Sequence, residues 1–465
     1  MNLTFPRDVM ASEDTAPLYH TQSLCPECLR RIPAVRFERG NDLCMRKTCP
    51  EHGEFQVVLW RGDPSYLGWV RPLKIPSYPE KPATQVVEGC PFDCGLCPDH
   101  RQHTCTALME VTQQCNLRCA FCFADANRSS QPNPDLATIR RWYEVVLSTE
   151  NSCNIQLSGG EPTLRDDLPD IVGLGRSMGC RFIQVNTNGL RLATEPAYVE
   201  KLKNAGLASV FLQFDGMSDD IYLKLRGAAY LSSKLAAIQT CREQGIGVVL
   251  VPTVVPGVND HVLGSIVEFA LKNLDVISGV HFQPVSYFGR YPAIPSDANR
   301  ITIPEVIRKL EIQTEGILRA ENFKPPGCEN ALCSFHGTFV LMPDSNVIAL
   351  TNHNPVDCRC GPLNAAEGAQ KSRQFVARNW SGKESTAPSH SDSAFSMGQW
   401  DVLLERSSTH KLCISGMAFQ DVWNIDLERL RDCCIHVISR DGRLIPFCAY
   451  NLTSSTGRSL FERGQ

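Results

Sequence analysis

Short apolar runs alternate with longer amphipathic stretches between about residues 105 and 320, which is the pattern of repeated strand and helix units. The apolar runs predict strands, and the amphipathic stretches predict helices between them. Strands are expected at 107–111, 154–157, 182–186, 209–214, 247–252 and 279–283, and helices at 136–147, 167–178, 196–205, 231–244, 261–271 and 304–315. This order predicts an α/β fold with an open, partial (βα)6 barrel, whose site lies in the loops after the strands.

Three cysteines follow the first predicted strand, namely Cys115, Cys119 and Cys122, with the spacing C-x3-C-x2-C. Three thiolates can ligate three irons of a four-iron cluster and leave the fourth iron open to another ligand. Because the cysteines follow the C-terminal end of a buried strand, they fall where parallel α/β folds place their active sites. Their spacing and position, with the aromatic Phe121 directly before the third cysteine, resemble the radical S-adenosylmethionine (radical SAM) superfamily. The fold that this implies is a TIM-like radical SAM barrel over residues 106–320.

The loops after the next three strands carry candidate S-adenosylmethionine ligands. Ser158-Gly159-Gly160-Glu161 ends the second strand, where paired glycines let a ligand lie against backbone and Glu161 offers a carboxylate to an ammonium group. In this position the loop resembles the methionine-amine site of the radical SAM superfamily. Asn188 and Asp215 end the third and fourth strands and offer polar groups to a ribose or carboxylate, and Arg226 offers a clamp for the methionine carboxylate. Local capping is the alternative role for these last three residues.

Residues 22–60 contain two pairs of metal-binding residues, Cys25 with Cys28 and Cys49 with His52. Two such knuckles separated by twenty residues resemble a zinc ribbon or a rubredoxin, in which each knuckle gives two ligands to a tetrahedral metal. Cys44 is the alternative to His52 as the fourth ligand. Spacing leaves both zinc and iron open, since both metals accept tetrahedral sulfur ligands.

A second C-x3-C-x2-C triplet, consisting of Cys90, Cys94 and Cys97, precedes the barrel and is here called the Cys90 triplet. It lacks a preceding apolar strand, and its prolines and glycine predict a tight loop. We therefore assign residues 84–105 to an auxiliary iron–sulfur cluster, with Cys105 as a possible fourth ligand.

Cysteines reappear in the C-terminal extension, residues 321–465. Candidates for a second auxiliary cluster are Cys328, Cys333, Cys433 or Cys434, and Cys448. Buried apolar thiols are the alternative. Residues 416–451 predict a helix, a short hairpin and a cysteine-containing turn.

The composition of the chain indicates the compartment and the classes of partner expected for this chemistry. The 22 cysteines of this 465-residue chain are grouped at metal-binding spacing behind a polar N-terminus, which predicts a reducing cytoplasm rather than a disulfide-bonded secreted protein. The net charge of −4 argues against a nucleic-acid partner. No apolar run reaches membrane-spanning length, so a lipid substrate would be delivered or met through transient contact with a membrane surface.

The cysteine and glycine blocks, taken in order from about residue 22 to residue 451, resemble the tetraether lipid synthase family, earlier described as pterin methyltransferase-like. The resemblance implies a radical SAM [4Fe–4S] cluster, S-adenosylmethionine, two further four-iron clusters and a rubredoxin-like iron. It also implies hydrogen abstraction by a 5′-deoxyadenosyl radical and carbon–carbon coupling of lipid alkyl chains, with a reductant such as ferredoxin or flavodoxin. The first alternative is a methyltransferase or modifier of a pterin or other small molecule. The second is a non-catalytic electron carrier, which the Gly159–Glu161 loop disfavours.

Overall fold

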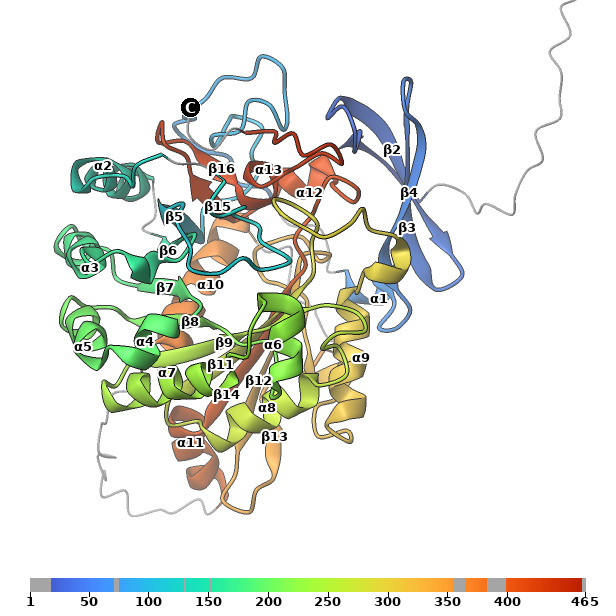
Figure 1. Ribbon diagram of the computed structural model, residues 1–465. Helices are drawn as coiled ribbons and strands as arrows, with labels where there is room; N and C mark the ends of the chain where they lie inside the picture. Colours follow the sequence, from blue (N-terminus) through green and yellow to red (C-terminus); the bar gives the residue numbers. More distant parts are fainter. Residues whose placement is uncertain are drawn as a thin grey trace, which may run out of the picture.

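The computed structural model describes residues 18–70, 75–128, 131–149, 153–353, 364–382 and 399–461. All six strands expected from the apolar runs form and lie as consecutive parallel neighbours in one sheet (Figure 1). They are β5 (Thr106–Thr112), β6 (Asn154–Gly159), β7 (Ile183–Thr187), β8 (Ser209–Gln213), β9 (Gly247–Val251) and β11 (Ile277–Pro284), with the short β10 (Thr253–Val254) paired to β11. Every residue of β5 and β9 is buried, as expected for central strands of a parallel sheet.

Helices cover the outer face of this sheet in the expected alternation (Figure 1). They are α2 (Leu136–Ser148), α3 (Leu168–Ser177), α4 (Leu190–Thr194), α5 (Pro196–Asn204), α6 (Asp219–Arg226), α7 (Leu231–Glu243), α8 (Leu263–Lys272) and α9 (Ile303–Gln313). In α2, Asp135 caps the first turn and the buried stripe contains Ile139, Trp142, Tyr143 and Val146. Among the described residues, no helix combines the length and hydrophobicity needed to cross a membrane.

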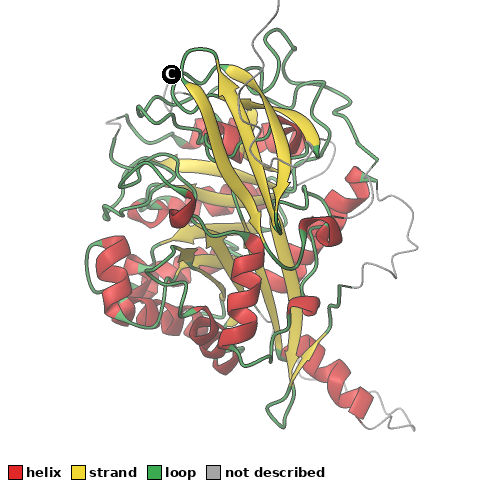
Figure 2. Ribbon diagram, turned by 90° about the vertical axis from the view of Figure 1, so that its right-hand side faces the viewer, coloured by secondary structure: helices red, strands yellow, loops and turns green. Residues whose placement is uncertain are grey.

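The C-terminal extension joins the barrel sheet at both of its edges. Strands β14 (Lys411–Met417) and β15 (Ile435–Ile438) run parallel to β11 and β5 respectively, and β12 (Ser334–Leu341), β13 (Val347–Ala349) and β16 (Leu444–Pro446) add antiparallel neighbours outside them. Figure 2 shows the strands in yellow, seen from the side that lies on the right in Figure 1. The sequence predicts a separate extension at 321–465, whereas its strands complete the same sheet as residues 106–320. Local periodicity gives no sign of this, because the paired strands lie far apart in the sequence.

Helix α10 (Ala365–Trp380) closes the N-terminal end of the barrel. Arg373 donates to the Thr104 carbonyl at 3.1 Å, and the Asn154 side chain donates to the Arg373 carbonyl at 3.3 Å, both next to the first residues of strands. The expected helix, hairpin and cysteine turn near the C-terminus appear as α12 (Leu427–Arg431), the β15–β16 hairpin and α13 (Phe447–Tyr450). Helix α11 (Gln399–Thr409) packs beside β12 and β14.

The N-terminal module is a four-stranded antiparallel sheet followed by the short helix α1 (Tyr66–Trp69). Its strands are β1 (Tyr19–Leu24), β2 (Arg31–Arg39), β3 (Asp42–Cys49) and β4 (Gly53–Arg61). The module packs against α9 and α12 (Figure 1). Buried Lys47 donates to the Ser23 hydroxyl and to the carbonyls of Leu24 and Val422, at 3.0, 2.8 and 2.7 Å. This contact fixes the module to the C-terminal segment, more than 370 residues along the chain.

Candidate active site

Cys115, Cys119 and Cys122 lie on the loop that leaves the C-terminal end of β5, as the sequence predicts. Burial raises the pKa of the Cys115 thiol to about 12, and the neighbouring charges of Glu161, Cys119 and Cys122 add to this effect. The Leu117 N–H donates to the Cys115 sulfur at 3.3 Å. Three thiols at this spacing on one loop are a donor set that fits an iron–sulfur cluster, which binds them as thiolates.

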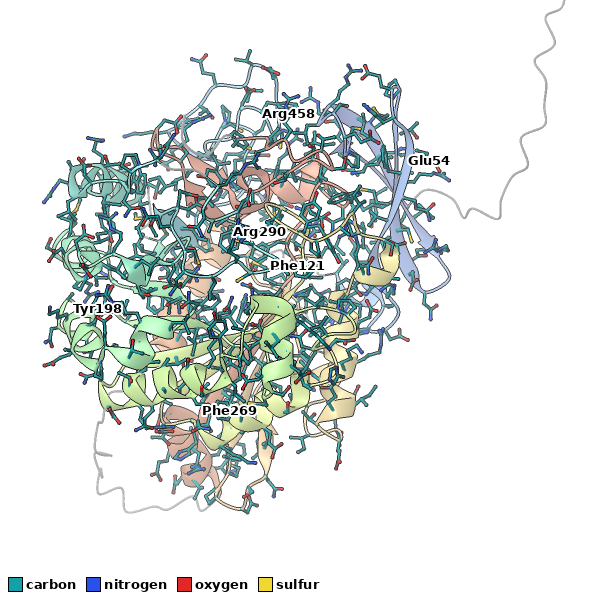
Figure 3. The ribbon with its side chains drawn as sticks, in the orientation of Figure 1. Glu54, Phe121, Tyr198, Phe269, Arg290 and Arg458 are labelled. Carbon is teal, nitrogen blue, oxygen red and sulfur yellow. The ribbon has the colours of Figure 1, made fainter. Side chains whose placement is uncertain are left out.

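Gly289 and Arg290 hold the loop that carries Cys115, Cys119 and Cys122, here called the cysteine loop. Neither residue was identified from the sequence. The backbones of Cys122 and Arg290 exchange two hydrogen bonds of 2.9 Å, and the Arg290 side chain donates to the carbonyls of Cys119 and Ala126 at 3.1 and 3.2 Å. Gly289 has φ +64°, and a Cβ atom there would lie 2.3 Å from the Cys122 carbonyl oxygen. In Figure 3, Phe121 and Arg290 both lie toward the middle of the molecule. A glycine and an arginine shortly after the sixth strand were the available signal.

The paired glycines Gly159 and Gly160 contact protein backbone rather than leaving room for a ligand. A Cβ atom on Gly159 would lie 2.1 Å from the Thr112 carbonyl oxygen, and one on Gly160 would lie 2.1 Å from that of Gln114. The Gly160 and Glu161 N–H groups donate to the same two carbonyls at 2.8 and 2.7 Å. The glycines therefore let the loop after β6 pack directly on the cysteine loop, and the expected contact of this loop with a ligand stays a prediction.

We predict that Gly160→Ala displaces this loop and lowers S-adenosylmethionine cleavage at least about tenfold, because the new methyl group would occupy the position of a backbone carbonyl that cannot move alone. Gly173→Ala is the matched control, since a Cβ atom on this α3 residue meets nothing within 4 Å. The measurement is deoxyadenosine released by reconstituted protein. Equal rates for the two variants would contradict the assigned contact.

Glu161 is 2% exposed, and its buried carboxylate joins the loop after β6 to the loop after β7. The carboxylate accepts hydrogen bonds from the Thr163 N–H and hydroxyl, the Thr187 hydroxyl and the Asn188 N–H, at 3.1, 2.6, 2.6 and 2.7 Å. These donors account for most of the acceptor capacity of a carboxylate. Glu161 thus anchors these loops, and its role as a ligand of the methionine ammonium group stays a prediction. Ser158 lies at the end of β6, where its hydroxyl accepts from Asn186 at 3.4 Å.

Asn188 connects the loop after β7 to the cysteine loop. Its side-chain amide donates to the Asn116 side chain at 2.7 Å, and its side-chain oxygen accepts from the Leu190 N–H at 3.0 Å. Below it, buried Lys234 on α7 donates to the Asn188 carbonyl and to the Gln213 side chain. Burial lowers the pKa of Lys234 to about 8. Sequence reasoning missed Lys234, because a lone lysine in a helix normally faces solvent.

Asp215 and Arg226 form a buried ion pair beneath the cysteine loop. Two guanidinium nitrogens donate to the two carboxylate oxygens at 2.7 Å each, and the Thr253 hydroxyl accepts a third hydrogen bond at 3.1 Å. Burial alone would lower the pKa of Arg226, but the Asp215 charge outweighs it and raises that pKa, with a smaller contribution from Cys119. Arg226 therefore has a protein carboxylate as its partner, and its role as a clamp for the methionine carboxylate stays a prediction.

In the N-terminal module, Cys25, Cys28, Cys49 and His52 gather their ligand atoms within 4.8 Å of one another. The Cys28 and Cys49 sulfurs are 3.9 Å apart, and His52 Nδ1 lies 3.5 and 3.4 Å from the sulfurs of Cys25 and Cys49. A tetrahedral metal with bonds of 2.3 Å to sulfur requires ligand separations of about 3.8 Å. Among the described residues Cys44 lies outside this group, so the geometry selects His52 over Cys44.

Cys105, Cys328 and Cys434 form a second close group at the opposite end of the barrel from Cys115, here called the Cys105 group. The sulfurs of Cys328 and Cys434 are 3.5 Å apart, and the Cys105 N–H donates to the Cys434 carbonyl at 2.7 Å. Hydrogen bonds among the three thiols, together with burial, raise the pKa values of Cys105 and Cys434 well above the usual range. The pairing of Cys328 with Cys434 was among the alternatives expected from the sequence, whereas Cys105, expected as a possible fourth ligand of the Cys90 triplet, joins these two cysteines instead of Cys333 and Cys448.

The Cys90 triplet has Cys433 rather than Cys105 as its neighbour. The pKa of Cys94 is raised well above the usual range by the hydrogen bond between Cys94 and Cys90 and by burial. The charges on Cys97 and Cys433 add to this increase. Burial likewise raises the pKa of Cys433, with smaller contributions from Cys448 and Cys333. Arg429 donates to the Cys333 sulfur at 3.3 Å. Cys433 therefore lies outside the Cys105 group, although it directly precedes Cys434, which is a member of that group.

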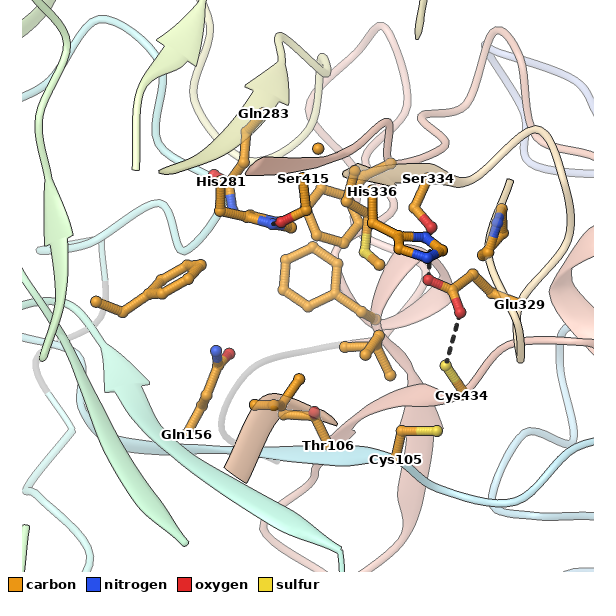
Figure 4. A pocket seen from close by; sticks show the side chains of 18 of the residues that line it. Cys105, Thr106, Gln156, His281, Gln283, Glu329, Ser334, His336, Ser415 and Cys434 are labelled. Carbon is orange, nitrogen blue, oxygen red and sulfur yellow. Dashed lines mark hydrogen bonds between the residues drawn. The ribbon is translucent and has the colours of Figure 1, made fainter. Parts of the chain in front are cut away.

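A cavity of about 460 Å³ lies inside the curved sheet and reaches both ends of the barrel (Figure 4). Phe121 and Cys122 line the cavity at the end that carries the cysteine loop. Cys105, Glu329 and Cys434 line it at the opposite end. The seven residues of β5 that separate these ends span roughly 23 Å at the usual rise of an extended strand. The cavity therefore connects two cysteine centres that are far apart.

Comparisons with known proteins agree with this architecture. Residues 109–270 match the Radical SAM superfamily, and residues 17–61 match the HMPTM N-terminal zinc ribbon domain. A 7,8-dihydro-6-hydroxymethylpterin dimethyltransferase from Methanocaldococcus jannaschii is 36% identical, over 93% of each chain. The chain belongs to this radical SAM family. A probable GTP 3′,8-cyclase from Methanothermobacter thermautotrophicus is 31% identical over 37% of this chain and 55% of its own. The crystal structure of Streptococcus suis SuiB covers 46% of this chain and 47% of its own, with 17% identity and a TM-score of 0.38.

The cavity of this radical SAM enzyme has mixed walls. Aromatic and aliphatic side chains predominate, among them Phe121, Phe123, Phe211, Phe288, Val285, Phe335, Phe375, Trp380, Met417, Phe419 and Phe447. Toward the middle of the barrel, His281 Nδ1 and the Ser415 hydroxyl are 2.8 Å apart, and Gln156 and Gln283 lie nearby (Figure 4). Burial lowers the pKa of His281 to about 4, so its imidazole is neutral at physiological pH.

Proposed function

We propose that this radical SAM enzyme activates unactivated C–H bonds of lipid alkyl chains and joins two of the resulting carbons. The observation that carries the proposal is the largely apolar cavity that reaches Cys122 at one end and the Cys105 group at the other. An extended, apolar substrate suits such a cavity, because aromatic and aliphatic side chains provide most of its lining surface.

Cys115, Cys119 and Cys122 would hold the radical SAM cluster, and the loops after β6, β7 and β8 would surround S-adenosylmethionine. Bound together, the cluster and S-adenosylmethionine supply a 5′-deoxyadenosyl radical that can take hydrogen from an unactivated C–H bond. Phe121 lines the cavity beside Cys122, and Arg290 and Glu161 hold the surrounding loops in place. Joining two carbons removes one hydrogen atom from each, so each new bond accounts for two deoxyadenosine molecules and two electrons from a ferredoxin or flavodoxin.

Three further metal sites belong to the proposal. The Cys25, Cys28, Cys49 and His52 set would hold zinc, since one imidazole with three thiolates is a common structural zinc site. The Cys105 group would hold one auxiliary iron–sulfur cluster, and the Cys90 triplet with Cys433 would hold another. None of the cysteines that the structure describes forms a disulfide, which supports a reducing, cytoplasmic setting with transient access to membrane lipid.

Pterin methylation is the second candidate. It is favoured by the pterin dimethyltransferase name of the Methanocaldococcus jannaschii relative and by the polar groups in the middle of the cavity. Gln156, Gln283 and the His281–Ser415 pair could hydrogen-bond the edge of a heterocycle.

The test is anaerobic incubation of reconstituted protein with S-adenosylmethionine, a reductant and either the host lipid extract or 7,8-dihydro-6-hydroxymethylpterin. We expect a new lipid lighter by two hydrogens than its two precursors, with two deoxyadenosines formed per product. Gln283→Leu separates the candidates further, because a polar edge contact matters for a pterin and an apolar replacement leaves an alkyl chain unaffected. Methylated pterin without any lipid product would overturn the first candidate.

A further inference from the structure

We propose that the N-terminal module positions the cysteine loop, with Lys47 and Asp421 as the positioning residues. The module acts through residues 419–426 of the C-terminal extension, here called the 419–426 segment, which lie between β14 and α12. This segment contacts the module on one side and the loop after β11 on the other. Because the cysteine loop serves S-adenosylmethionine cleavage, the role is the same for either candidate substrate.

Buried hydrogen bonds join the module to the 419–426 segment. Lys47 is 2% exposed and donates to the Val422 carbonyl at 2.7 Å. The same ammonium group donates to the hydroxyl of Ser23 at 3.0 Å, and this fully buried hydroxyl donates to the Ile425 carbonyl at 2.6 Å. Leaving such buried groups without partners costs free energy, so the segment has one preferred position on the module.

The residues that make these contacts lie close to the metal ligands of the module. Ser23 lies on β1, two residues before Cys25, and Lys47 lies on β3, two residues before Cys49. A metal held by both cysteines would fix the ends of these two strands relative to each other. The proposed metal site would therefore also fix the two side chains that hold the 419–426 segment.

Asp421 connects the 419–426 segment to the loop after β11. Its fully buried carboxylate accepts hydrogen bonds from the Tyr287 N–H at 3.0 Å and from the Arg300 guanidinium at 2.8 and 3.0 Å. The Ser286 hydroxyl donates to the Phe419 carbonyl at 2.9 Å. The segment therefore holds two successive residues of the loop after β11.

The loop after β11 in turn contacts the cysteine loop. The rings of Tyr287 and Phe121 meet edge to face with their centroids 5.9 Å apart, and Trp423 of the segment packs on Tyr287 at 6.4 Å. Three residues after Tyr287, the Arg290 backbone exchanges its two hydrogen bonds of 2.9 Å with Cys122. Contacts thus run without a gap from the module to the third cysteine of the radical motif.

The test compares full-length Lys47→Met and Arg39→Met with the wild-type protein by hydrogen–deuterium exchange and by deoxyadenosine formation. Lys47→Met removes the ammonium group and keeps a side chain of similar length. We expect it to speed amide exchange at least about fivefold in residues 419–426, 285–291 and 119–123, and to lower deoxyadenosine formation about tenfold. Arg39→Met removes an exposed cation from β2 of the same module and is expected to match the wild-type protein.

Two further variants keep the test decisive. Ser23→Ala removes one hydroxyl and is expected to give the same exchange pattern with a smaller amplitude, which covers the case in which Lys47→Met unfolds the module. Cys28→Ser removes a metal ligand without touching the 419–426 segment, and it is expected to release the metal and to reproduce the pattern of Lys47→Met.

Two results would overturn the inference. One is faster exchange in Lys47→Met and Ser23→Ala that is confined to the module and the 419–426 segment, because a purely structural contact would give that pattern. The other is undiminished deoxyadenosine formation in Lys47→Met. Failure of the proposed metal site is distinguishable, because Cys28→Ser would then keep its metal content and its exchange rates while Lys47→Met would still change them.

Discussion

Cys119→Ala is expected to reduce deoxyadenosine formation to the background rate while leaving most of the bound iron in place. Cys119 is the most buried thiol of the radical motif, and Arg226 and Arg290 pack against its loop. Its loss leaves two thiolates, which cannot hold three corners of a cluster. The other cysteine groups lie in separate parts of the molecule and keep their ligands. Deoxyadenosine by chromatography and iron and sulfide by analysis are measured on the same sample.

Cys241→Ala is the matched control for this experiment. Cys241 is also buried, on α7, within the main hydrophobic core. Removing its sulfur should cost about 1 kcal/mol of folding free energy and leave the cleavage rate unchanged. Loss of all iron in Cys119→Ala would contradict separate metal centres, and undiminished deoxyadenosine would contradict the assignment of the radical motif.

Local sequence patterns predicted the barrel units well. Each of the six strands and the helices between them formed close to the expected residues, because apolar periodicity reports directly on burial along a strand or helix. The cysteine spacing also identified the radical motif and the N-terminal metal module, since both ligand sets are local in sequence.

Long-range groupings escaped prediction for a physical reason. Cys105, Cys328 and Cys434 meet because β15 pairs with β5 and because α10 packs against Cys105. Neither contact leaves a periodic signal in the chain. Adjacent cysteines such as Cys433 and Cys434 cannot be distributed between two centres until the path of the backbone is known.

The loop that contains Gly159 and Gly160 shows a different limit of prediction from sequence. Gly159 and Gly160 indicated correctly that something approaches the backbone closely, but a glycine does not reveal what that neighbour is. Here the neighbour is the cysteine loop itself. Likewise, the polar residues after the third and fourth strands were located correctly, while their partners turned out to be other side chains of the same site.

Asp215→Ala is expected to destabilise the fold by roughly 3–5 kcal/mol, because it leaves the Arg226 guanidinium buried without its carboxylate. The control is Asp166→Ala, which breaks the ion pair between Asp166 and Arg191. Because the Asp166 side chain is 91% exposed, this loss should cost only about 0.2–1 kcal/mol of folding free energy. Urea unfolding of the two variants under identical metal loading measures the difference. Equal midpoints would show that the buried pair contributes little.

The same pair should also govern cleavage, because the Ala120 N–H of the cysteine loop donates to the Leu225 carbonyl, one residue before Arg226, at 3.0 Å. The double variant Asp215→Leu with Arg226→Met removes both charges and replaces them by apolar groups, so it should regain much of the lost stability. If it also regains deoxyadenosine formation, the ion pair serves the fold alone. We expect the double variant to regain stability but not deoxyadenosine formation. Once Arg226 is replaced, no guanidinium lies beside Cys119 and Thr253.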